Sequence, residues 1–253
     1  MKTMTKNILL AACLSMTLAQ GYAQEKIRDV RTHPTDYFLR IDEVANSLHL
    51  LPPPPEPGSI LFMYDEARYQ WGKLQRETPR GELAVSDARL GGDGMSIAFN
   101  EAFGMEITKE NTPEIYRLIR KMREDAGDLA TRAAKQHYMR KRPFAFFHED
   151  TSLPEDQKSL STNGSYPSGH TASGWATALV LAEINPDRQD AILQRGYEIG
   201  QSRVICGYHF QSDVDAARIV ASAVVARLHA NEEFNKQMKK AKAEFNRLKK
   251  QSK

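Results

Sequence analysis

The chain has 253 residues, of which 41% are hydrophobic and 26% are charged, and its formal net charge is +3. This indicates one domain with a sizeable core and excludes an intrinsically disordered chain. Loss of the first 23 residues would remove two lysines and no acidic residue, lowering the charge from +3 to +1, which excludes the clustered basic surface of a general nucleic-acid-binding protein.

Residues 1–23 have the layout of a secretory signal peptide. Two lysines precede an apolar stretch at residues 8–19, and a small-x-small cleavage site ends at Ala23. We therefore expect cleavage after Ala23 and a periplasmic or secreted mature protein. Leu10-Ala11-Ala12-Cys13 also resembles a lipoprotein box, which would make Cys13 a lipid attachment site, although apolar residues continue beyond it. Beyond residue 23 no window of 18 apolar residues exists, so no integral membrane segment is expected after cleavage.

Residues 24–58 are predicted to form an N-terminal arm that contains the run Pro52-Pro53-Pro54-Pro55. A polyproline run is a stiff, extended connector, and it could serve as a ligand for a proline-binding module. Packing of the arm on the protein's own surface is the simpler interpretation. The domain proper is expected to span residues 59–253.

Helical periodicity and capping signals dominate this domain. Ser59, Thr112-Pro113 and Asn185-Pro186-Asp187 have the residue types of helix starts and stops. The predicted helices cover residues 59–77, 81–89, 96–103, 113–122, 128–140, 171–184, 187–204 and 213–230. No run alternates with the period of two that strands require. The sequence therefore predicts an all-α fold, a single-domain helical bundle.

Three features of the domain need an interpretation. The glycine-rich segment 88–94 lacks the spacing of a phosphate-binding loop and is predicted to be a turn. Gly127 marks either a close helix crossing or a weak point in a helix. Near the C-terminus, five apolar residues follow a 4-3-4-3 spacing that would suit either a dimer seam or docking on the protein's own core. They are Phe234, Met238, Ala241, Phe245 and Leu248.

The stretch Gly164-Ser165-Tyr166-Pro167-Ser168-Gly169-His170-Thr171 directly precedes a long apolar run. Ser168 and Thr171 are good helix N-caps, so we expect a loop that delivers backbone N–H groups to the start of a buried helix. Such a helix start attracts anions, because free N–H donors and the positive end of the helix dipole face the ligand. His170 would add a proton donor at the same place.

Two further pairs of polar residues flank this stretch. Lys135 and Arg142 are two helical turns apart, which predicts that both project from one helix face, and Pro143 places Arg142 at the helix end. His209 and Asp213 are four residues apart, so on a helix the carboxylate would reach the imidazole and fix its tautomer.

In chain order these segments read Lys-x6-Arg-Pro, Pro-Ser-Gly-His and Ser-Arg-x5-His-x3-Asp. This order resembles the signature of the phosphatidic acid phosphatase type 2/vanadium haloperoxidase superfamily. Gly-Ser-Tyr-Pro-Ser-Gly-His-Thr resembles the fingerprint of bacterial class A non-specific acid phosphatases, and the likeness covers nearly the whole mature chain. The resemblance implies a fold of this all-α type and broad-specificity hydrolysis of phosphate monoesters, with phosphotransferase or nucleotidase side activity.

The resemblance also implies a role for each motif residue. His209 is the expected nucleophile, which forms a phosphohistidine, Asp213 orients it, and His170 is the expected general acid and base. The expected phosphate-binding groups are Lys135, Arg142, Ser168, Gly169 and Arg203. Three fixed cations suit neutralisation of a phosphoryl group in transfer, so we expect no metal ion and no other cofactor, and we expect vanadate to bind as an inhibitor. His170 must be protonated while His209 is neutral, which predicts activity at mildly acidic pH.

After signal cleavage the chain keeps one cysteine, Cys206, which excludes an internal disulfide. Relatives in this family often pair this cysteine with one in the loop before Pro-Ser-Gly-His, but residues 148–163 contain none. We expect a buried thiol, with an intermolecular bridge as the alternative.

The expected partners are small phosphorylated substrates and further copies of the chain, in a homodimer or a larger assembly. Three other functions remain open from the sequence. A lipid or isoprenoid phosphate phosphatase and a vanadate-dependent haloperoxidase belong to the same superfamily. A phosphate-binding periplasmic protein would account for the cations, although it would not require two histidines.

Overall fold

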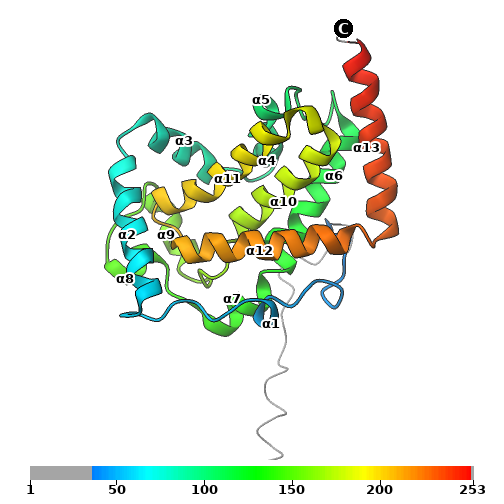
Figure 1. Ribbon diagram of the computed structural model, residues 1–253. Helices are drawn as coiled ribbons and strands as arrows, with labels where there is room; N and C mark the ends of the chain where they lie inside the picture. The colour runs from blue at the N-terminus through cyan, green and yellow to red at the C-terminus, as the bar shows by residue number, and fades with distance from the viewer. Residues whose placement is uncertain (1–35, 252–253) are drawn as a thin grey trace, which may run out of the picture. The chain divides into compact units, whose positions relative to one another are not determined.

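The computed structural model describes residues 36–251, and every regular element in this range is a helix (Figure 1). The predicted all-α fold is therefore confirmed. The predicted signal peptide, including Cys13, lies outside the described residues. Within them, no helix combines the length and the apolar character that a membrane crossing requires.

Long helices build the bundle, and short ones connect them. The α-helices are α1 (Ser47–Leu50), α2 (Ile60–Gln75), α3 (Pro79–Ala88), α4 (Gly94–Ile97), α5 (Asn100–Phe103), α6 (Pro113–Glu124), α7 (Arg132–Tyr138), α8 (Pro143–Phe147), α9 (Gln157–Leu160), α10 (Gly169–Ile184), α11 (Gln189–Ile205), α12 (Gln211–Leu228) and α13 (Glu232–Gln251). A π-helix, η2 (Asp125–Leu129), joins α6 to α7, and 3₁₀ turns η3 (Pro154–Asp156) and η4 (Pro186–Arg188) precede α9 and α11. The helix predicted at 96–103 is split into α4 and α5 around the fully buried Phe99.

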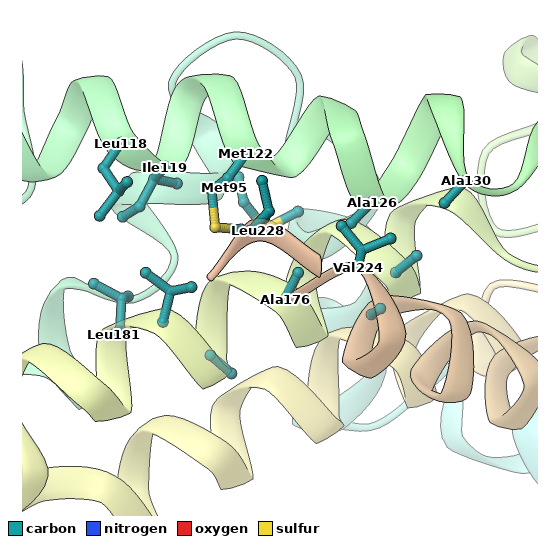
Figure 2. Close-up of a cluster of buried hydrophobic side chains, with 14 of the residues drawn as sticks. Met95, Leu118, Ile119, Met122, Ala126, Ala130, Ala176, Leu181, Val224 and Leu228 are labelled. Atoms are coloured by element: carbon teal, nitrogen blue, oxygen red, sulfur yellow. The ribbon is translucent and has the colours of Figure 1, made fainter. Parts of the chain in front are cut away.

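Helix α10 lies at the centre of the bundle, because apolar side chains cover nearly every face of this helix and must all be buried. Helices α6, α11 and α12 pack against it (Figure 1). In the core, side chains of α6, α10 and α12 meet (Figure 2); among them are Leu118, Ile119, Met122, Ala176, Leu181, Val224 and Leu228, all fully buried. Burial stabilises each of the larger side chains by about 1.5–3 kcal/mol, so the position of the α10 N-terminus is fixed by the core behind it.

Gly127, on the π-helix, lies at a close crossing with α10. A Cβ atom at this position would come within 2.1 Å of Ser173 Oγ and 2.9 Å of the Gly169 carbonyl oxygen. Only glycine fits such an approach without moving the neighbouring backbone. Of the two interpretations of Gly127, the structure supports the helix crossing.

The C-terminal helix α13 packs on the protein's own core. Phe234, Met238, Ala241 and Phe245 are buried. On the same helix, the Glu244 carboxylate accepts the backbone N–H groups of Glu114 (3.1 Å) and Ile115 (3.0 Å) at the start of α6. A negative charge is favourable there because the helix N-terminus is electropositive. The apolar stripe is thus a docking face within the chain.

The described part of the N-terminal arm also packs on the domain. Phe38 and Leu39 are buried, and their backbone N–H groups donate to the Asp125 carboxylate at 3.1 and 2.9 Å. Further along the arm, the Tyr166 hydroxyl donates to the Pro52 carbonyl oxygen at 2.8 Å. The polyproline run therefore passes beside the loop that leads into α10.

Candidate active site

The loop that ends in Ser168 starts α10 as the sequence predicts. Ser168 is the N-cap, with extended backbone, and its Oγ accepts the Thr171 N–H at 3.4 Å and the Thr171 hydroxyl at 2.9 Å. Its own hydroxyl proton is left to donate to a ligand. A Cβ atom at Gly169 would lie 2.7 Å from the Gly127 carbonyl oxygen, so this position requires glycine. The first N–H groups of α10 form a donor set of the kind that binds phosphate oxygens.

Lys135 and Arg142 do not share a helix face, so that prediction is wrong. Helix α7 ends at Tyr138, and Met139 turns the chain through a left-handed conformation (φ 40°). Arg142 has extended backbone and is the N-cap of α8, because Pro143 at the first helical position disfavours helical backbone at the preceding residue. Arg142 therefore lies at a helix start, not at a helix end.

The two cations nevertheless reach the same buried region. The Lys135 ammonium donates to the Gly164 carbonyl oxygen at 2.7 Å, next to the loop that starts α10. Burial and the nearby Arg142 guanidinium hold the pKa of Lys135 well below its ordinary value. Burial and Arg203 lower the pKa of Arg142 to about 10. Like charges are thus forced together, and a bound anion would relieve their repulsion.

Arg203, near the end of α11, is the cation with the most unused donor capacity. Its Nε and Nη1 atoms are buried, and neither has a hydrogen-bond partner among the described residues. The guanidinium lies 4.3 Å from the centroid of the Tyr208 ring, which holds the plane in place. Buried polar atoms are normally hydrogen-bonded, so these free N–H groups indicate a missing acceptor.

His209 and Asp213 meet, although not on one helix. His209 lies in the turn before α12, Phe210 is the N-cap, and Asp213 follows in the first helical turn. His209 Nδ1 is 3.3 Å from Asp213 Oδ2, which also accepts the Phe210 N–H at 2.8 Å. The contact was predicted, but the helical geometry assumed for it is wrong. Asp213 is held at the N-terminus of α12 by the Phe210 N–H, and the turn before the helix places the His209 ring beside the Asp213 carboxylate.

The other ring nitrogen of His209 faces the cations. Nε2 lies 3.0 Å from Arg142 Nη1, which can only donate. With the proton on Nδ1, toward Asp213, Nε2 keeps its lone pair. Burial, and then the Arg142 charge, hold the pKa of His209 well below its usual value, which favours the neutral ring.

A network of ionic and hydroxyl groups fixes Asp213. Arg140 donates to Asp213 Oδ1 at 2.6 Å and to Asp65 Oδ2, on α2, at 2.8 Å. The Ser165 hydroxyl donates to Asp213 Oδ2 at 2.5 Å and lies 3.2 Å from His209 Nδ1. Burial alone would raise the pKa of Asp213, but Arg140 and the hydrogen bonds from His209 and Ser165 bring it below its ordinary value. The carboxylate therefore stays ionised.

His170, in the first turn of α10, is partly exposed. Above all the Arg203 charge, and then burial and His209, hold the pKa of His170 well below its usual value. The charges that act most on its ring are thus those of the cation with unsatisfied donors and of His209. A bound phosphate would partly cancel the positive field and raise the pKa of His170 again.

Comparison with known proteins decides the family. The model of the PAP2 superfamily matches residues 126–236, which include all eight candidate residues. The chain is 63% identical over 222 residues to a non-specific acid phosphatase of Providencia stuartii, covering 88% of this chain and 90% of the relative. The chain belongs to the bacterial non-specific acid phosphatases of the PAP2 superfamily.

Other members of the family are also similar. A non-specific acid phosphatase of Salmonella typhimurium is 42% identical, covering 83% of this chain and 84% of the relative. An acid phosphatase of Zymomonas mobilis is 34% identical, covering 94% of this chain and 89% of the relative. The chain is accordingly an enzyme of the phosphoric monoester hydrolase class.

In this acid phosphatase, the residues that support Asp213 are not among those predicted from the sequence. Ser165 stands inside the fingerprint, two residues before Pro167. A hydrogen bond from its hydroxyl to the His209–Asp213 pair could have been expected from that position. Arg140 was hidden in the basic cluster Arg140-Lys141-Arg142. Asp65 gives no signal, because it lies 75 residues before Arg140 and looks like any polar residue on a helix.

Cys206 is a free, fully buried thiol, as expected, and its Sγ lies 3.3 Å from the Ala84 carbonyl oxygen. Among residues 36–251, no group of three or more His, Cys, Asp or Glu side chains is arranged to hold a metal ion.

Proposed function

We propose that this chain is a secreted, broad-specificity acid phosphatase that hydrolyses phosphate monoesters through a phosphohistidine on His209, without a metal ion. The observation that carries the proposal is the unsatisfied guanidinium of Arg203 in the same site as a neutral, oriented His209. A phosphoryl group supplies the acceptors that this cation lacks. The layout of residues 1–23 supports secretion.

In the first step, His209 Nε2 attacks phosphorus and the bond from phosphorus to the ester oxygen breaks. Arg142, Arg203 and Lys135, with the N–H of Gly169 and the Ser168 hydroxyl, neutralise the three equatorial oxygens. Arginine suits bidentate contacts and lysine acts as a point charge. Asp213 stabilises the positive charge that develops on the ring as Nε2 becomes bonded to phosphorus.

His170 supplies the proton that the leaving alkoxide needs and then removes one from the water that hydrolyses the phosphohistidine. In the free enzyme the pKa of His170 is low, because Arg203 and burial disfavour the charged ring. The negative substrate brings that pKa up, so the protonated form is reached in the complex. As pH rises, this proton is lost, and we expect activity to fall on the alkaline side.

Three fixed cations take the place that a metal ion has in many phosphotransfer enzymes. Vanadate, which matches the trigonal bipyramidal geometry of the transition state, should therefore inhibit competitively. Broad specificity follows if the enzyme holds the phosphoryl group tightly and the leaving group loosely. Phosphotransfer to an alcohol would then need only an alcohol in the place of water.

The test is hydrolysis of p-nitrophenyl phosphate by the mature protein at mildly acidic pH with excess EDTA. The wild type should stay active, His209→Ala should be inactive, and His137→Ala should match the wild type, because His137 is exposed and outside the motif positions. Loss of wild-type activity with EDTA would contradict the metal-free route. Phosphate binding without any turnover would favour a binding protein, and bromide oxidation by the vanadate-loaded protein would favour a haloperoxidase.

A further inference from the structure

Helix α2 carries an apolar face that is largely exposed to solvent. The helix packs against α11 and α12 through one side, which is formed by the buried Phe62, Asp65, Tyr69 and Gly72. On the opposite side, Ile60 is 84% exposed and Leu74 is 76% exposed. We call this side the outer face of α2; its residues are Ile60, Met63, Tyr64, Ala67, Gln70, Trp71 and Leu74. Figure 1 shows α2 at an edge of the bundle.

The contacts of the inner side prevent α2 from turning its outer face inward. The Asp65 carboxylate accepts the Ser212 backbone N–H at 2.8 Å and a hydrogen bond from Arg140 at 2.8 Å. A Cβ atom at Gly72 would come within 2.9 Å of the Val204 carbonyl oxygen, so the helix lies directly on α11 there. These contacts fix the rotation of α2 about its own axis. The outer face of a single copy therefore stays exposed.

The outer face is large for a protein that works as a monomer. Its exposed surface is roughly 600 Å², at the upper end of the roughly 300–600 Å² that the largest apolar patch of a soluble monomer usually reaches. Each partner in a standard protein–protein interface buries about 800 Å². Leu61, beside the outer face, is also exposed and extends the area. The patch thus has most of the area that a specific interface needs.

The spacing of the outer face is symmetric about Ala67. Its members stand seven, four and three residues before Ala67 and three, four and seven residues after it. A two-fold axis that passes beside Ala67, at right angles to α2, would bring each residue to the level of its counterpart in a second, antiparallel copy. The counterparts are Ile60 and Leu74, Met63 and Trp71, and Tyr64 and Gln70.

The helical period also determines how these counterparts would meet. Residues at equal distances before and after Ala67 lie on opposite sides of the midline of the face, so Met63 of one copy would interlock beside Trp71 of the other. Ala67 itself has a small side chain at the centre. Two helix axes can therefore approach to the roughly 8–10 Å at which packed helices lie. The outer face is complementary to itself.

Two other occupants fit the outer face less well. A helix that lies on an anionic lipid surface is rich in Lys and Arg beside its apolar face, but here Arg68 is held by Gln201 at 2.8 Å and Lys73 by Glu149 at 2.7 Å. Glu66 adds a negative charge between them. Residues 24–35 of the chain contain two aliphatic side chains, Ile27 and Val30, which is too few to cover a face of four helical turns.

We propose that the outer face of α2 is the interface through which two copies of this chain pair, antiparallel, about a two-fold axis beside Ala67. The sequence predicts an assembly of copies but does not say which surface forms it. The interface is independent of the chemistry proposed for His209, so the failure of one leaves the other standing.

The first experiment measures the mass of the mature protein by sedimentation over a range of concentrations. The wild type should be a dimer or an assembly with an even number of copies. Leu74→Lys, which places a charge in the interface of both copies, should raise the dissociation constant at least tenfold. Leu74 is exposed in the single copy, so the variant should fold. The matched control is Ile97→Lys, another exposed aliphatic residue, on α4; it should leave the mass unchanged.

The second experiment tests the register by oxidising cysteine variants of the mature protein. Its one native thiol, Cys206, is buried and does not compete. Ala67→Cys should form a disulfide-linked dimer, because the axis brings the two Cα atoms within bonding range. Ile60→Cys and Leu74→Cys should each fail alone, because equivalent positions in the two copies are about 21 Å apart along the helices. The double variant Ile60→Cys with Leu74→Cys should crosslink.

Three results would overturn the assignment. One is a wild type that is monomeric at every concentration. Another is an assembly that Leu74→Lys leaves intact, and the third is efficient crosslinking of Ile60→Cys alone or none of Ala67→Cys. A monomer that binds vesicles of phosphatidylcholine and phosphatidylglycerol would give the face to lipid, and a monomer that assembles only after deletion of residues 24–35 would give it to that segment.

Discussion

Two arginines at this site, the half-buried Arg140 and the buried Arg203, have opposite surroundings. Arg140 donates to Ser212, Asp213 and Asp65. Burial alone would lower its pKa, but the two carboxylates raise it. Among residues 36–251, no carboxylate lies within hydrogen-bond distance of Arg203, and its Nε and Nη1 are unsatisfied. Burial lowers its pKa.

The difference separates two sets of residues. Arg140, Asp65, Ser165 and Asp213 hold the site in one geometry and are called its frame here, whereas Arg203 has donors left for a ligand. A buried ion pair with complete hydrogen bonds holds its members in one geometry, and removing either partner is costly. A buried cation without partners costs stability in the free protein, which is tolerated where a ligand completes it. On this argument, Arg140 holds Asp213 and His209 in place, and we propose that Arg203 binds the phosphoryl group.

The largest expected effect is on activity, in Arg203→Leu. Removal of a cation that stabilises the transferring phosphoryl group should lower kcat/KM for p-nitrophenyl phosphate by about 10³-fold or more. The free energy of unfolding should change by less than about 1 kcal/mol, or rise, because an unpaired buried charge is removed. Urea unfolding beside steady-state kinetics checks both. A large loss of stability would show that Arg203 belongs to the frame.

Arg140→Leu should show the reverse pattern in stability. It leaves Asp65 and Asp213 buried without their cation, which should cost about 3–5 kcal/mol in the free energy of unfolding. Activity should also fall, since Asp213 loses the group that positions it. The control is Arg89→Leu, whose side chain is 63% exposed and paired with Glu155; it should cost less than about 0.5 kcal/mol. Equal effects of the two substitutions in urea would contradict the comparison.

Asp125 extends the comparison to a buried carboxylate whose hydrogen-bond donors, within the described part of the chain, are the backbone N–H groups of Phe38 and Leu39. Burial raises its pKa to about 7, although the N–H groups of Leu39 and Phe38 and the charge of Lys121 oppose the shift. The folded protein thus binds this proton more tightly than the unfolded chain, so its contribution to stability is lost as pH rises from about 4 to 7. The loss is at most about 4 kcal/mol.

This contribution can be isolated by measuring the free energy of unfolding against pH for the wild type and Asp125→Asn. The variant should lack the component that decreases from pH 4 to pH 7, whatever its offset in absolute stability. His170 and His209, whose pKa values are lowered, contribute the opposite slope in both proteins and cancel in the difference. Two parallel curves would show that Asp125 does not titrate in this range.

The smallest effect is expected for Ser165→Ala. The Ser165 hydroxyl donates to Asp213 and lies beside His209 Nδ1, but Arg140 still holds the carboxylate. We expect kcat to fall about tenfold with little change in KM, because one hydrogen bond to a charged group is lost. Kinetics with p-nitrophenyl phosphate, with the exposed Ser161→Ala as control, measures this. A loss as large as that of Arg203→Leu would place Ser165 in direct contact with the substrate.

Local rules were sufficient for much of the fold. The all-α class, the order of the long helices, the Ser168 cap and the burial of Cys206 follow from periodicity, capping chemistry and cysteine count. The positions where one helix ends and the next begins were harder to predict from the sequence. Met139 adopts a left-handed conformation that its residue type does not announce, and this separates Lys135 from Arg142.

The site was predicted less completely than the fold, because its frame is made of long-range contacts. The motifs predict the cations and the histidines. Asp65, however, is linked to Asp213 through hydrogen bonds from Arg140 and Ser212, which lie far from Asp65 in the sequence. The His209–Asp213 contact was predicted from a helical spacing, and it arises instead from a helix N-terminus that Asp213 caps. Such partners follow from packing, which a single sequence does not display.

The most direct test of the central claim is to trap the covalent intermediate. The mature protein is mixed with a radiolabelled phosphate monoester at mildly acidic pH, quenched in alkali during turnover and digested, because phosphohistidine survives alkali. We predict that the label is found on the peptide that contains His209, is absent in His209→Ala and is unchanged in His137→Ala. Turnover without any labelled peptide, or label on another residue such as Ser168, would contradict the account.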